Sequence, residues 1–78
     1  MKLSKEQFIE QYIYYFTEMQ KASLKDDNIT NNRYAKKLYR LKKENENEKY
    51  FIDALKELMN NESIEISSIA AVDCLRWS

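Results

Sequence analysis

The sequence has no glycine, no proline and no histidine, and it has a single cysteine. Glycine and proline commonly punctuate strands and hairpins, so their absence favours helices joined by asparagine, aspartate and serine turns. A chain without glycine also lacks the phosphate-binding loops of nucleotide enzymes. Without histidine it lacks the usual proton shuttle near neutral pH, and one cysteine cannot complete a zinc site of ordinary ligation. We therefore predict no enzymatic activity, no metal and no cofactor.

Two further features are missing from the sequence. The lone Cys74 has no partner for an internal disulfide, which is typical of a protein from a reducing compartment. No signal peptide follows Met1, and no apolar run is long enough to cross a bilayer. These absences predict a cytoplasmic protein that makes no use of a membrane.

What the chain does have is enough apolar material for one small core. It has 78 residues, of which 44% are hydrophobic, and its 13 basic residues balance 13 acidic ones. A chain of this length supports one domain with a marginal core. The zero net charge argues against nucleic-acid binding over the whole surface. We expect residues 1–78 to form a single small helical domain, or the N-terminal part of a longer one.

The first predicted helix runs from Lys5 to Leu24. Ser4 and Gln7 have the spacing of a capping box at its start. The apolar residues fill one broad face at helical periodicity: Phe8, Ile9, Tyr12, Ile13, Tyr15, Phe16, Met19 and Ala22. Tyr14 falls on the opposite, polar face. An exposed tyrosine there is either an incidental surface residue or an anchor for a partner.

The second predicted helix, Thr30 to Glu44, separates apolar from basic residues. Its expected buried stripe is Tyr34, Ala35, Leu38, Tyr39 and Leu41. Its opposite face carries Arg33, Lys36, Lys37, Arg40 and Lys43. With Lys42, six basic residues and no acidic one lie between Arg33 and Lys43, whereas acidic residues prevail from Tyr50 to Ser78. The basic face is either simply solvated or a patch for an acidic partner.

The last two predicted helices span Glu48 to Asn60 and a segment that begins after the cap residue Ser63. The final helix is apolar almost all the way round, with Ile69, Val72 and Leu75 on a side of their own. We therefore expect neighbours to cover it on several sides, supplied by a longer domain or by another chain. Asp73 lies among its apolar residues, and we expect a hydrogen-bonding or ion-pairing role for it because a buried carboxylate needs a partner.

This last pair of helices resembles a HEAT-type repeat. The segment ALKELM (54–59), a polar turn with NESIEI (61–66), and IAAVDCLR (69–76) follow the order of such a pair, including the alanine pair Ala70-Ala71. Together with Asn32-Arg33, Lys37-Leu38 and Leu41, the pattern is similar to a family of small bacterial proteins of unknown function with HEAT-like helices. The resemblance implies an all-α fold of antiparallel helical hairpins of the α-α superhelix type. It also implies an immunity-type protein that binds a toxin domain.

We predict a non-catalytic module that binds another protein. The predicted partner-binding residues are Tyr14, Arg33, Lys36, Lys37, Arg40 and Trp77. Two alternatives remain open at this point. The final helix could instead pair with a second copy or a larger assembly, or the basic face of the second helix could bind nucleic acid.

Overall fold

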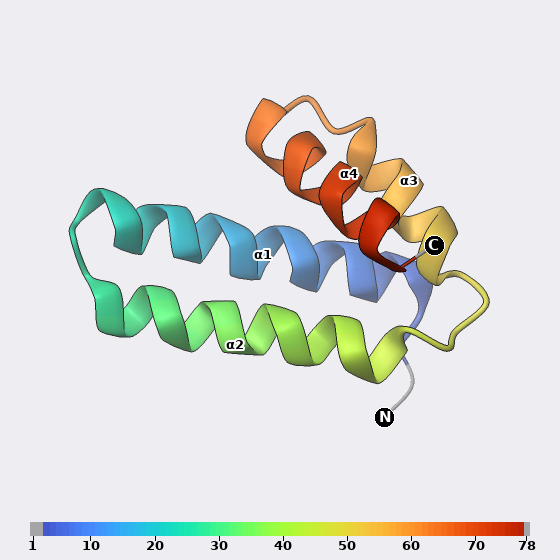
Figure 1. Ribbon diagram of the computed structural model, residues 1–78, viewed down its shortest axis with the longest axis horizontal. Helices are drawn as coiled ribbons and strands as arrows, with labels where there is room; N and C mark the ends of the chain where they lie inside the picture. The colour runs from blue at the N-terminus through green and yellow to red at the C-terminus, as the bar shows by residue number, and fades with distance from the viewer. Residues whose placement is uncertain (1–2, 78) are drawn as a thin grey trace.

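The computed structural model describes residues 3–77 and contains four helices (Figure 1). They are α1 (Lys5–Leu24), α2 (Asn28–Asn45), α3 (Phe51–Met59) and α4 (Ile64–Trp77). No strand occurs among the described residues. The prediction of an all-α fold with about four helices is therefore confirmed. None of these helices combines the length and the apolar composition that crossing a membrane requires.

The first helix has the bounds and the cap that its sequence predicts. The Ser4 hydroxyl accepts the backbone N–H of Gln7 at 3.1 Å, and the Gln7 side chain accepts the backbone N–H of Ser4 at 2.9 Å. These two bonds satisfy amide groups that no helical carbonyl can reach.

The end of α1 shows how a chain without glycine makes a tight turn. Asp26 takes the left-handed conformation, with φ of 55°, which aspartate tolerates better than most residues. The backbone N–H of Asp27 then donates to the carbonyl of Ala22 at 2.8 Å, and that of Asp26 to Ser23 at 3.1 Å. This is the bonding pattern of a Schellman motif. The Asp27 side chain next caps α2 by accepting the N–H of Thr30 at 3.0 Å, so α2 starts two residues before the predicted Thr30.

The polar segment before α3 is more ordered than its composition suggests. Asn45, which lies one residue beyond the predicted end of the second helix at Glu44, is the last residue of α2 and is buried. Its amide donates to the Leu41 carbonyl at 2.8 Å and accepts the Tyr50 hydroxyl at 2.6 Å. Asn45 thereby ties the end of α2 to the residue that precedes α3. The third helix begins at Phe51, three residues after the predicted Glu48.

The four helices form two hairpins. Helices α1 and α2 run antiparallel along the molecule, and α3 and α4 pack on each other and across the N-terminal half of α1 (Figure 1). The other end of the α1–α2 hairpin projects past α3 and α4. There, Leu24 and Ile29 are exposed because no further element covers them.

The core lies where the two hairpins meet. Tyr12, Phe8, Phe51, Leu55 and Leu58 are its largest fully buried side chains. The rings of Phe8 and Phe51 meet edge to face with centroids 5.5 Å apart, which is a favoured aromatic geometry. Ala54 and Ala70 are also fully buried, and alanines at such positions let helices approach closely.

One expectation about burial is wrong, and the cover expected for the final helix is not supplied by the described part of this chain. Tyr39, assigned to the buried stripe of α2, is 54% exposed, because that stripe is centred further round the helix on Leu38 and Leu41. The final helix is not wrapped on several sides within this chain. Ile69 is partly buried against the core, but Val72 is 54% exposed and Leu75 82% exposed. The neighbours α1, α2 and α3 all lie on one side of α4.

A candidate contact surface on α2

The outer side of α2 carries the basic residues as predicted. Its inner side buries Leu38 and Leu41. Because of the helical periodicity, the residues on the opposite side face the solvent. We define the basic face as five exposed side chains: Arg33, Lys36, Lys37, Arg40 and Lys43. They cover about three turns of one helix, and a positive potential extends along this length.

The basic face makes few ion pairs among residues 3–77, although the exposed Glu44 lies beside Lys37 and Arg40. Lys43 pairs with Glu46 at 3.5 Å. Among residues 3–77, the other four basic side chains of this face make no salt bridge. Four cations are therefore free to meet anionic groups from outside the molecule.

The basic face is corrugated and open. One hollow of about 590 Å³ lies between side chains of α2 alone: Asn32, Ala35, Lys36, Tyr39, Arg40 and Lys43. A neighbouring hollow of about 510 Å³ adds Ile29, Arg33 and Lys37. A hollow formed by one helix cannot enclose a small molecule, because a ligand site usually covers most of its ligand from several sides. This relief instead suits the side chains of a macromolecular partner.

The structure brings Tyr14 next to the basic face, which the sequence did not reveal. Its ring centroid lies 6.1 Å from that of Tyr34 on α2, with the two planes nearly perpendicular. Tyr15 is 6.1 Å from Tyr34 as well. The Lys37 ammonium lies 5.0 Å from the Tyr34 centroid, within the range of a cation–π contact. A group of three tyrosines therefore continues the basic face onto α1.

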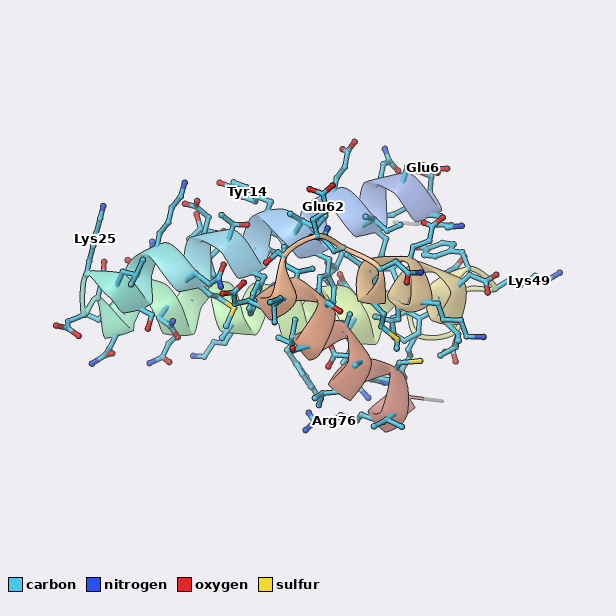
Figure 2. The ribbon with its side chains drawn as sticks, turned by 90° about the horizontal axis from the view of Figure 1, so that it is seen from above. Glu6, Tyr14, Lys25, Lys49, Glu62 and Arg76 are labelled. Atoms are coloured by element: carbon cyan, nitrogen blue, oxygen red, sulfur yellow. The ribbon has the colours of Figure 1, made fainter. Side chains whose placement is uncertain are left out.

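Tyr14 is itself exposed, as predicted. It is 54% accessible and projects from α1 on the side of the molecule opposite to Arg76 (Figure 2). The predicted residues Tyr14, Arg33, Lys36, Lys37 and Arg40 thus share one surface. Tyr34 is an additional member of it. The signal for Tyr34 was its place at the edge of the α2 stripe, one turn before Lys37.

Trp77, the sixth predicted contact residue, lies apart from this surface. Its ring meets Phe51 nearly at right angles, with centroids 5.9 Å apart. Its indole N–H donates to the Glu46 carboxylate at 2.8 Å, and the Lys42 ammonium lies 5.3 Å from its ring. The partly buried Trp77 side chain is therefore occupied by contacts within the molecule.

The Trp77 ring borders a buried ionic group that joins α1, α2 and α4. The Lys42 ammonium lies 3.0 and 3.1 Å from the two Asp73 carboxylate oxygens, and the Tyr12 hydroxyl donates to the same carboxylate at 2.5 Å. All three side chains are buried. Burial, reinforced by the bond to Asp73, raises the pKa of Tyr12 far above its ordinary value of 10.0.

This group confirms a local ion-pairing role for Asp73 and shows the position of Lys42, which we assigned to neither face of α2. We counted Lys42 among the basic residues of α2, but it is only 7% exposed and faces the core. The signal was present in the spacing, because Leu38, Leu41, Lys42 and Asn45 follow one helical stripe. Every buried side-chain nitrogen and oxygen among the described residues has a hydrogen-bond partner. The group therefore acts as a satisfied structural link between helices and offers no open position to a substrate.

Metal binding finds no support in the described part of the chain, where no three cysteine or acidic side chains gather as ligands would. Comparison with known protein families, characterised proteins and solved structures finds no match to this chain. The HEAT-like, immunity-type resemblance thus stays a prediction, and the surface on α2 is the feature on which a function can be argued.

Proposed function

We propose that this chain is a non-catalytic protein-binding module whose basic face on α2, extended by Tyr14 and Tyr34, contacts an acidic surface of another protein. The observation that supports it most is the row of five exposed cations on one helix, of which one has an anionic partner among residues 3–77. The chain has no net charge, but its positive charge is concentrated on one side. An acidic surface therefore attracts it in a preferred orientation.

The chemistry of this surface suits a protein partner. Arg33 and Arg40 can each bind a carboxylate through two parallel N–H groups. Tyr14 and Tyr34 offer large, rigid rings with a polar tip, and tyrosine and arginine are enriched at interface hot spots. The ring contacts between Tyr14, Tyr15 and Tyr34 hold these side chains in place before binding, which lowers the entropy lost on association.

The sequence resemblance narrows the proposed partner. It favours an acidic surface on a bacterial toxin domain, which an immunity-type protein would cover in the cytoplasm. Such an inhibitor needs only a rigid complementary surface and no chemistry of its own. A reducing compartment is in keeping with the single, unpaired Cys74.

Nucleic acid is the second candidate, because the same row of cations could follow a phosphate backbone. The described surface outside α2 speaks against it, since exposed Asp53, Glu57, Glu62 and Glu65 on and between α3 and α4 would repel phosphates. Binding of α2 to phosphates would weaken steeply with salt. For each phosphate neutralised, the association constant would fall about tenfold for every tenfold rise in salt concentration.

The test compares two double variants of equal charge change. Lys36→Glu with Arg40→Glu reverses the centre of the basic face, and Lys49→Glu with Lys56→Glu reverses two exposed lysines elsewhere. Each tagged protein captures partners from a lysate of the source cell. The captured proteins are then purified and titrated against each variant by calorimetry. Fluorescein-labelled duplex DNA and single-stranded RNA are titrated in parallel by anisotropy.

We expect a captured protein that binds the wild type and the control with equal affinity. It should bind the α2 variant at least about 30-fold more weakly, as for a lost hot spot. A captured protein that binds all three equally would contradict the proposal. Tight, salt-sensitive binding of DNA or RNA that the α2 variant alone loses would replace it with the second candidate.

A further inference from the structure

The outer side of α4 is a second surface, independent of the basic face. Its residues Ile64, Ser68, Ala71 and Leu75 are spaced four, three and four apart, which places them in one line along the helix. We call this line the α4 seam. Ile64 is 77% exposed and Leu75 82% exposed, and Val72 beside them is 54% exposed. Figure 2 shows α4 carrying Arg76 away from the other helices.

The exposed apolar residues of α4 form a regular row along the helix. Leu24 and Ile29, at the far end of the α1–α2 hairpin, form no such row. A seam with this alternating spacing is the contact pattern of two helices packed along each other. Its large residues stand at the two ends and its small ones, Ser68 and Ala71, stand in the middle. Small residues at a crossing point let two helix backbones approach closely.

We propose that the α4 seam binds the α4 seam of a second copy of this chain, with the two helices antiparallel about a two-fold axis. The seam is self-complementary in this arrangement. Its centre falls between Ser68 and Ala71, so that Ile64 of one copy lies against Leu75 of the other. The small central residues of both copies then face each other, and both large pairs are buried.

The charges beside the seam select the same orientation. Glu65 and Arg76 lie on one flank of α4, near its opposite ends, and both are exposed. Among residues 3–77 neither forms a salt bridge. A two-fold axis across antiparallel helices brings equal flanks together, so Glu65 of one copy meets Arg76 of the other, twice in each dimer. A parallel pair about a two-fold axis would instead put these flanks on opposite sides of the contact, so that neither Glu65 nor Arg76 would meet its counterpart.

The dimer leaves the basic face free. Helix α2 forms the edge of the molecule away from the α3–α4 pair (Figure 1), and Tyr14 and Arg76 point to opposite sides (Figure 2). A dimer through α4 therefore presents two basic faces outward. Two linked faces would bind a repeated acidic surface more tightly than one.

The first experiment measures the mass of the 78-residue chain by sedimentation equilibrium over a range of concentrations. A helix of 14 residues is about 21 Å long. This small contact predicts a weak dimer, with a dissociation constant of about 10 to 100 µM. A chain that stays monomeric up to about 1 mM would overturn the proposal.

Matched variants then locate the contact. Leu75→Glu should weaken the dimer by about 30-fold or more. The control is Leu24→Glu, since Leu24 is 88% exposed at the end of α1 and belongs to no seam. It should leave the dimer unchanged, and circular dichroism checks that both variants keep their helices. Equal weakening by both variants would place the contact elsewhere and overturn the proposal.

Charge exchange tests the orientation. Glu65→Lys and Arg76→Glu should each weaken the dimer, because each puts two like charges together across the axis. The protein with both substitutions should regain the wild-type dissociation constant within about threefold, since opposite charges again face each other. A double variant as weak as the single ones would contradict the antiparallel arrangement.

Discussion

Helices α2 and α4 have similar inner sides and opposite outer sides. Inside, Lys42 of α2 and Asp73 of α4 form one ion pair within the core, 3.0 Å apart. Outside, α2 presents cations and α4 presents Ile64 and Leu75. The inner residues are fixed by what they contact within the chain. The outer residues contact little within it, and the partners that we propose are inferred from the chemistry of each outer side.

The largest expected effect comes from breaking the inner ion pair. Asp73→Ala leaves the Lys42 charge buried without its anion and removes the acceptor of the Tyr12 hydroxyl. We expect it to lower the free energy of unfolding by about 3 to 5 kcal/mol, measured by urea titration with circular dichroism. The exposed Asp53→Ala is the control and should cost within about 0.5 kcal/mol.

A companion variant separates the charge from the packing. Lys42→Met together with Asp73→Leu removes both charges, and it should recover much of the stability lost in Asp73→Ala. A double variant as unstable as Asp73→Ala would show that shape or the lost acceptor of the Tyr12 hydroxyl, and not an unpaired charge, causes the loss.

The next effect compares two isoleucines on α4. Ile66 is 6% exposed on the inner side, and Ile64 is 77% exposed on the outer side. Ile66→Ala should destabilise the dilute protein by about 2 to 4 kcal/mol, because it leaves a cavity in the core. Ile64→Ala should change the free energy of unfolding by less than about 0.5 kcal/mol. Equal losses would mean that the two sides of α4 do not differ as described.

A smaller effect follows from the pKa of Tyr12. Burial holds its folded pKa far above 10.0, whereas the unfolded chain releases the phenolic proton near that value. The unfolded state therefore binds fewer protons than the folded state above pH 10, and stability falls as the pH rises. The contribution to the slope is at most about 1.4 kcal/mol per pH unit.

Tyr12→Phe removes this titration. Urea titrations of both proteins between pH 8 and about 11 should give a shallower decline for the variant above pH 10. Parallel curves would show that the Tyr12 hydroxyl ionises as easily in the fold as in water.

The smallest effect compares two lysines of α2. Lys36 belongs to the basic face, and Lys42 lies in the core. Lys36→Ala should leave the free energy of unfolding within about 0.5 kcal/mol, because surface substitutions rarely change it more. Lys42→Ala leaves the buried Asp73 carboxylate without its cation. It should lower the free energy of unfolding several times as much. Urea titration of the two variants measures the contrast, and a large loss from Lys36→Ala would contradict an outer position for it.

The sequence predicts the parts of this molecule that depend on local spacing. The bounds of α1, its capping box and the exposure of Tyr14 all follow from periodicity and cap chemistry. The ion-pairing role of Asp73 follows from its apolar surroundings. These features need no knowledge of which helix packs on which.

Features that depend on neighbours could not be predicted in the same way. The spacing of Lys42 places it on the buried stripe of α2, but only the position of α4 makes it the partner of Asp73. Tyr14 and Tyr34 meet because α1 and α2 form a hairpin. The outer side of α4 is apolar, which is typical of a helix side that other helices cover. In this chain the other helices pack only against the inner side of α4.

The most direct test of this account measures the stability of a variant altered only on the outer sides. It combines Lys36→Ala, Arg40→Ala, Val72→Ser and Leu75→Ser, four substitutions of exposed residues. Urea titration of the dilute protein should find a free energy of unfolding within about 1 kcal/mol of the wild type, since these side chains make few contacts within the fold. A loss of about 3 kcal/mol or more would contradict that claim, because the outer sides would then be needed to hold the four helices together.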